Sequence, residues 1–233
     1  MAPGFSLRAG DVGPVQQSPV TCGSACLTVA RMLVNPAFAR WIRTGEGPRG
    51  DAPGGETEQE RFAAYERVVM RRTNGLVGGG RRVNVPWPHA LGTPPWGARG
   101  ELEFGASRRG THYEVRQLRS LSTSSLRQAH GRLVDVVAEG VPALLYLGGT
   151  WLPRHVTLVL PGDGDRRLDV YDPASGRVTL LDEDQFAGRE LGIAGWDVPW
   201  IGVLPDGLSR VQAFGFSTGM SAASRTSGIS ASA

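Results

Sequence analysis

The chain has 233 residues, of which 40% are hydrophobic and 20% charged, an ordinary composition for a protein that buries a core. The formal charge is only +3, and the arginines are scattered among acids without an aromatic–basic stripe, so nucleic-acid binding is not indicated. The longest apolar run, residues 141–147, contains a proline and is too short to cross a bilayer. The N-terminus lacks the basic and apolar regions of a signal peptide, so we expect a cytoplasmic protein without membrane insertion.

The N-terminal stretch around Cys22 is the first regular element. Pro19 disfavours helix in the residue before it, and Thr21 is an acceptable N-cap. From Cys22 onward, small and apolar residues recur at helical spacing until Asn35-Pro36 stops the pattern. The sequence therefore predicts a loop that runs into a helix beginning at Cys22.

The rest of the N-terminal half alternates short helices with loops rich in glycine and proline. A short helix is expected over 37–42, and a polar helix opens at Glu56 and ends at Asn74-Gly75. Residues 76–110 carry Gly78-Gly79-Gly80 and several Pro-Trp pairs, and they predict an irregular excursion.

Regular patterning returns in the C-terminal half. An amphipathic helix is predicted over 124–139, and tight turns separate the strands that follow it, which indicates an antiparallel meander. Residues 209–233 are rich in Ser and Ala, and we expect them to be disordered and dispensable. We therefore expect one α+β domain over 1–208, with N-terminal helices packed on a C-terminal antiparallel sheet. The predicted strands are 113–118, 143–147, 155–160, 168–171, 177–181 and 200–204.

The two cysteines, Cys22 and Cys26, lie four residues apart on one predicted helix. Their side chains point the same way, which is poor geometry for a disulfide, and no Cys or His pair elsewhere completes a metal site. We expect no metal and no cofactor. A thiol at a helix N-terminus sits at the positive end of the macrodipole, which favours the thiolate, so Cys22 is a candidate nucleophile. The alternative is a small buried hydrophobic residue, as most free cysteines are.

A cysteine nucleophile needs a base and a group that orients the base. Of the four histidines, only His155 opens an apolar strand, and the next strand ends in Asp172-Pro173. Two antiparallel strands joined by a short turn bring the start of the first beside the end of the second. We therefore expect His155 and Asp172 to be neighbours.

These residues resemble the papain-like cysteine peptidases of the C39 family, which process the leader peptides of bacteriocins. The matching positions are Gln16, Cys22-Gly23, His155 and Asp172-Pro173. The resemblance implies a papain-like fold, with Cys22 as nucleophile, His155 as general base and acid, Asp172 as its orienting group and Gln16 as an oxyanion-hole donor. Gln17 is the register alternative for Gln16. The resemblance leaves residues 44–110 as an insertion.

The expected function is a cysteine peptidase that acts on a peptide or protein substrate. We expect substrate selection to reside in the inserted excursion, with Trp87, Trp96 and Trp151 as binding anchors; simple packing is the alternative for each tryptophan. Two other readings stay open: an acyl or amide transferase, and a catalytically silent peptide-binding or regulatory module on the same fold.

Overall fold

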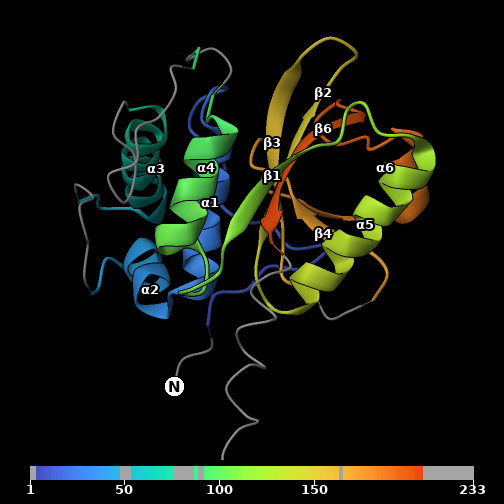
Figure 1. Ribbon diagram of the computed structural model, residues 1–233. Helices are drawn as coiled ribbons and strands as arrows, with labels where there is room; N and C mark the ends of the chain where they lie inside the picture. The colour runs from blue at the N-terminus through green and yellow to red at the C-terminus, as the bar shows by residue number, and fades with distance from the viewer. Residues whose placement is uncertain (1–3, 48–53, 76–86, 89–91, 163–164, 207–233) are drawn as a thin grey trace, which may run out of the picture.

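An antiparallel sheet separates two groups of helices (Figure 1). The computed structural model describes residues 4–47, 54–75, 87–88, 92–162 and 165–206. Within them, helices α1 to α4 lie on one side of a six-stranded sheet and helices α5 and α6 on the other. The predicted α+β class, with N-terminal helices packed on an antiparallel sheet, is confirmed, and this is the arrangement that the papain-like resemblance implies.

The first three helices begin and end at local sequence signals. Helix α1 (Cys22–Val34) is followed directly by α2 (Pro36–Thr44), because the Asn35 side chain between them accepts a hydrogen bond from the Phe38 backbone N–H and caps α2. Helix α3 (Glu58–Asn74) starts with a reciprocal capping box between Thr57 and Glu60. Thr21 occupies the N-cap position of α1, but its hydroxyl donates to the Ser18 carbonyl oxygen and makes no cap bond.

The sheet is only partly the meander that the turns predict. Strands β2, β3, β4 and β5 follow one another as expected, but the last strand, β6, pairs with β2 and β1 instead of β5. Strand β2 is buried along its whole length, so its backbone needs partners on both sides, and β6 supplies the second side. The strands are β1 (Tyr113–Gln117), β2 (Ala143–Gly148), β3 (Pro153–Val159), β4 (Leu168–Tyr171), β5 (Val178–Leu181) and β6 (Val198–Pro205).

Each face of the sheet carries its own hydrophobic core. Side chains alternate along a strand, so Leu144 and Tyr146 of β2 join the core beneath α1 to α4, whereas Leu145 and Leu147 join the core beneath α5 (Thr123–Ala138) and α6 (Glu183–Gly188). Both faces are covered, which is why β2 reads as a continuous apolar run. None of the described helices is long and apolar enough to span a membrane.

The expected irregular excursion contains a buried helical segment. Helix α4 (Pro95–Glu101) continues into a π-helical turn at Leu102–Ala106, and Ala98, Leu102 and Ala106 are all buried at a spacing of one turn. Glycines weaken the helical signal of this stretch, but Gly97 is needed there, because a Cβ on it would lie 2.5 Å from the Thr73 carbonyl oxygen of α3. Residues 76–86, 89–91 and the predicted tail lie outside the described residues.

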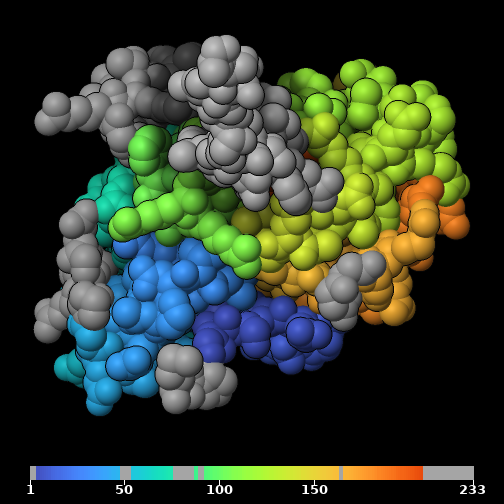
Figure 2. Space-filling model, turned by 60° about the horizontal axis from the view of Figure 1, so that its bottom comes forward, coloured from blue at the N-terminus to red at the C-terminus, as the bar shows by residue number. Residues whose placement is uncertain are grey.

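The N-terminal segment connects the sheet to the helices. It runs beside the edge strand β5, where the Gly10 N–H donates to the Val178 carbonyl oxygen (3.1 Å) and the Gly13 N–H to the Gly176 carbonyl oxygen (2.7 Å). In the space-filling view this dark-blue segment lies between the blue helices and the gold strands (Figure 2). It then leads through residues 14–21 into α1.

Candidate active site

Cys22 is the first residue of α1, and α1 packs directly against β3. The residue is only 3% exposed, and its thiol is free. Backbone N–H groups in the first turn of a helix have no intrahelical acceptor, so they face whatever lies beyond the helix start. The sulfur therefore sits beside a set of hydrogen-bond donors suited to an anion.

His155 lies near the start of β3, and its ring is held on both sides. Its Nε2 lies 2.7 Å from Asp172 Oδ1, and its side chain also hydrogen-bonds to Cys22, which leaves Nδ1 as the nitrogen for the sulfur. Burial alone would lower the pKa of His155, but the bonds with Asp172 and Cys22 outweigh it and raise the pKa to about 9. The structure thus brings Cys22, His155 and Asp172 together, as the sequence predicts.

Asp172 follows β4 and is fixed by the turn that it begins. Its Oδ1 also accepts from the Ala174 backbone N–H (3.0 Å), and its Oδ2 accepts from the Ser175 hydroxyl (2.7 Å). Burial works to raise the pKa of Asp172, yet the hydrogen bonds from His155, Ser175 and Ala174 hold it below its ordinary value. Sequence reasoning named Asp172 and missed Ser175. The turn pattern Asp-Pro-Ala-Ser-Gly could have indicated Ser175, because an Asp at the start of a turn accepts hydrogen bonds from the residues two and three positions later.

Gln16 and Gln17 lie on the loop before α1 and differ in exposure. Gln16 is half-buried, its Nε2 donates to the Ser18 carbonyl oxygen (2.8 Å), and its buried Oε1 has no hydrogen-bond partner among the described residues. Gln17 is exposed, and its Nε2 donates to the Val15 carbonyl oxygen (3.1 Å). The Gln16 backbone N–H donates to the Pro173 carbonyl oxygen (2.8 Å), which ties this loop to the turn that carries Asp172.

Residues 92–94 lie beside the start of α1, near Cys22, and sequence reasoning missed them. Gly92 has φ +71° and packs against the loop before α1. Thr93 is fully buried: its carbonyl oxygen accepts from the Tyr146 hydroxyl (2.9 Å), and its hydroxyl lies 3.2 Å from that of Ser24. We call residues 92–94 the glycine wall. No local pattern reveals it, because its partners lie on α1 and β2.

The three tryptophans proposed as substrate anchors do not form one surface feature. Trp87 and Trp96 are half-buried and pack edge to face, with ring centroids 5.1 Å apart. Within the part of the chain that the structure describes, neither indole nitrogen has a hydrogen-bond partner. Trp151 is 85% exposed on the turn between β2 and β3, four residues before His155. A binding role stays a prediction for all three.

Cys26 lies one turn after Cys22 and differs from it chemically. It is fully buried, and its thiol donates to the Val156 carbonyl oxygen (3.4 Å). Burial, followed by the charge of Cys22, raises the pKa of Cys26 well above its ordinary value. In the described part of the chain, no three side chains of His, Cys, Asp or Glu are grouped so that they could hold a metal ion.

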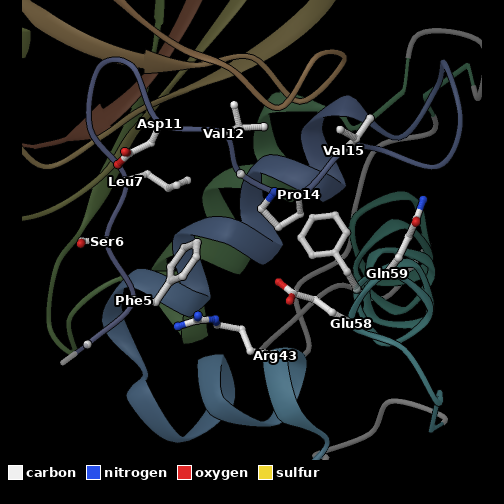
Figure 3. A pocket seen from close by; sticks show the side chains of 13 residues that line it. Phe5, Ser6, Leu7, Asp11, Val12, Pro14, Val15, Arg43, Glu58 and Gln59 are labelled. Carbon is white, nitrogen blue, oxygen red and sulfur yellow. The ribbon is translucent and has the colours of Figure 1, made fainter. Parts of the chain in front are cut away.

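A cavity of about 740 Å³ lies beside the loop that leads to the site, between the N-terminal segment and helices α2 and α3 (Figure 3). Phe5, Leu7 and Pro14 face it from the N-terminal segment, and Arg43 and Glu58 face it from the helices. Cys22, His155 and Asp172 are not among its lining residues. All three of these residues are buried.

Comparison with known proteins finds similarity at the level of structure only. No protein-family model matches the chain, and no curated protein matches its sequence. The structure is similar to that of the avirulence protein AvrPphB of Pseudomonas, with 13% identity, a TM-score of 0.46, and coverage of 86% of this chain and 96% of that one. It is also similar to the peptidase domain of Streptococcus ComA, a bifunctional ABC transporter involved in a quorum-sensing pathway, with 16% identity, a TM-score of 0.37, and coverage of 84% and 98%.

Proposed function

We propose that the chain is a cysteine peptidase in which Cys22, His155 and Asp172 form the catalytic triad. One observation carries the proposal: a buried histidine is held between the only thiol at a helix start in the described residues and a buried carboxylate 2.7 Å from its Nε2. This is the arrangement that activates a thiol and keeps the base in one tautomer.

The reaction follows from this geometry. The Cys22 thiolate attacks the substrate carbonyl carbon, and the carbonyl oxygen becomes an oxyanion that the first-turn N–H groups of α1 and the Gln16 amide stabilise. The His155 imidazolium then gives its proton to the leaving amine, and the C–N bond breaks to leave a thioester on Cys22. Water attacks the thioester as His155 takes its proton, which releases a carboxylate and restores the thiolate–imidazolium pair.

The test is hydrolysis of a mixed-sequence peptide library by the full chain, followed by mass spectrometry. Cys22→Ala and His155→Ala should abolish cleavage, whereas Cys26→Ala, a matched change of the neighbouring thiol, should retain it. A library that the folded wild-type chain leaves intact, or cleavage that persists in Cys22→Ala, would contradict the proposal. If an amine is added and the acyl part of the cleaved peptide is found attached to it, the chain would instead be an acyl transferase.

A further inference from the structure

Glu66 is a carboxyl group buried beneath the loop that leads into Cys22. It lies on α3, one turn after the core residue Phe62, on a helix that packs against α1. Only 1% of the residue is exposed, a rare degree of burial for a glutamate. The reaction described above makes no use of it.

The Glu66 carboxylate holds the loop at Gln17. The Gln17 backbone N–H donates to Oε2 at 3.2 Å and lies 3.4 Å from Oε1, and the Thr21 side chain lies close enough to the carboxylate to lower its pKa. Gln17 directly follows Gln16, and Thr21 directly precedes Cys22. Glu66 thus lies beside the residues that adjoin Gln16 and Cys22 in the sequence.

The other side of the loop is held by the sheet. The Gln16 backbone N–H donates to the Pro173 carbonyl oxygen at 2.8 Å, and the Tyr171 hydroxyl donates to the Pro14 carbonyl oxygen. If the contact from α3 were lost, the loop would keep its anchors at residues 14 and 16 and lose the hydrogen bond at Gln17. The Glu66 contacts therefore decide where the loop meets the start of α1.

We propose that Glu66 is a positioning residue, whose ionised carboxylate fixes residues 16–21 so that the Gln16 amide and the first-turn N–H groups of α1 converge on the substrate oxyanion. This inference rests on the proposed function, because the convergence matters for rate only if Cys22 attacks a carbonyl. A charged acceptor binds an N–H about twice as strongly as a neutral one, so the ionised form holds the loop better than the acid form.

The ionisation of Glu66 is expected to change near neutral pH. Burial raises its pKa to about 7, against the opposing effects of Thr21, Gln17 and Arg67. The titratable groups near it are Arg67 on its own helix, Cys26 of α1 and Tyr171 of β4. Burial raises the pKa values of Cys26 and Tyr171 well above their ordinary values, so both stay neutral near pH 7 while Glu66 titrates. The hydrogen bond from Gln17 lowers the pKa of Glu66 and therefore favours the ionised carboxylate, so this contact with the loop should weaken as pH falls through about 7.

Hydrogen exchange on the full wild-type chain tests the contact without any need for turnover. We expect protection of the amides of residues 15–21, corrected for intrinsic exchange, to fall about tenfold from pH 8 to pH 6 as the charge-assisted bond is lost. Protection of residues 95–101 in α4 should stay constant. In Glu66→Gln, protection of the loop should no longer depend on pH. The same pH dependence in Glu66→Gln and wild type would overturn the proposal.

Kinetics tests the positioning role. Glu66→Gln should lower kcat for peptide hydrolysis at pH 8 by roughly tenfold or more, with KM within about twofold, and should remove an acid-side inflection near pH 7. Alkylation of Cys22 by iodoacetamide, which needs no oxyanion hole, should be unchanged. The matched control is Glu101→Gln: this glutamate is also buried with a raised pKa, but it pairs with Arg72 (3.7 Å) and not with the loop.

The outcomes separate the two proposals. Equal losses of kcat in Glu66→Gln and Glu101→Gln would reduce Glu66 to a general packing residue and overturn its positioning role. A wild-type chain that shows the pH-dependent exchange but cleaves no peptide would overturn the peptidase proposal while leaving the loop contact in place.

Discussion

Gly92 approaches Cys22 so closely that a Cβ built on Gly92 would lie 4.0 Å from the Cys22 sulfur and 2.9 Å from the Val20 carbonyl oxygen. A side chain at position 92 would therefore be in van der Waals contact with the Cys22 sulfur. Its neighbour Thr93 is locked to Tyr146 and Ser24, so the wall cannot move away without disturbing the core. The identity of residue 92 should matter to catalysis.

Gly92→Ala should lower kcat/KM by tenfold or more, because the new methyl group displaces the loop before Cys22. Strain from the positive φ of +71° should cost about 1 kcal/mol of folding stability as well. The measurement is peptide hydrolysis alongside thermal unfolding. Gly10→Ala is the control, since Gly10 has φ +92° and open space around it, and it should lose stability without losing activity. Equal activity losses in the two variants would contradict a specific role for the wall.

Cys22 and Cys26 should differ sharply in alkylation. At about pH 6, iodoacetamide should label Cys22 first, because its thiol is hydrogen-bonded to the His155 imidazole, the proposed acceptor of its proton. Cys26 is fully buried with a raised pKa and should label only on unfolding. Mass spectrometry of the labelled peptides measures the ratio of Cys22 to Cys26 alkylation. Preference for Cys26, or equal labelling, would rule out the proposed nucleophile.

Peptide hydrolysis should decline as pH rises through about 9. The pKa of His155 is raised to about 9, so the imidazolium persists below that pH and is lost above it, and the leaving amine then has no proton donor. Alkylation of Cys22 needs only the thiolate and should not decline. Measuring the pH–rate profile of both reactions distinguishes the role of the His155 imidazolium from that of the Cys22 thiolate.

Asp172→Asn should move the alkaline limb of that profile to lower pH. The hydrogen bond from His155 to the Asp172 carboxylate raises the pKa of His155, and an amide in its place gives up that stabilisation of the imidazolium. We also expect kcat to fall by roughly 10²–10⁴-fold, the usual worth of a positioned acid–base group. An alkaline limb at the wild-type position in the variant would show that Asp172 does not act on His155.

Ser175→Ala should weaken the orientation of Asp172 without removing it. The variant loses the 2.7 Å bond to Oδ2, while the bond from the Ala174 N–H to Oδ1 remains. We expect kcat to fall several-fold and the free energy of unfolding to fall by about 1 kcal/mol. Ser122→Ala, which removes the N-cap of α5 at a similar cost in stability, should leave kcat unchanged.

Local sequence signals were enough to predict most elements and the proximity of His155 and Asp172. The helix start at Cys22 is marked by proline and small-residue spacing, and His155 and Asp172 come from strands that follow each other along the chain. A short connection between antiparallel strands fixes which residues become neighbours. The prediction of their proximity therefore needed no long-range information.

Features that depend on distant parts of the chain were not predictable in this way. Thr93 is positioned by Ser24 and Tyr146, and β6 is drawn to β2 by backbone groups that need partners. Helix α4 forms because tertiary burial outweighs its weak helical propensity. Glu66 did leave a signal, because it is a charged residue one turn after Phe62 on α3. Helical periodicity alone does not distinguish such a buried charge from an exposed one.

The proposed nucleophile belongs to the helical side of the molecule and its proposed base to the sheet, with α1 and β3 in direct contact between them. A chain in which the helices have folded but have not yet docked on the sheet has the thiol without the imidazole. On the proposed mechanism, the Cys22 sulfur becomes reactive only after both parts have assembled. An incompletely folded chain would then be unable to cleave itself or its neighbours.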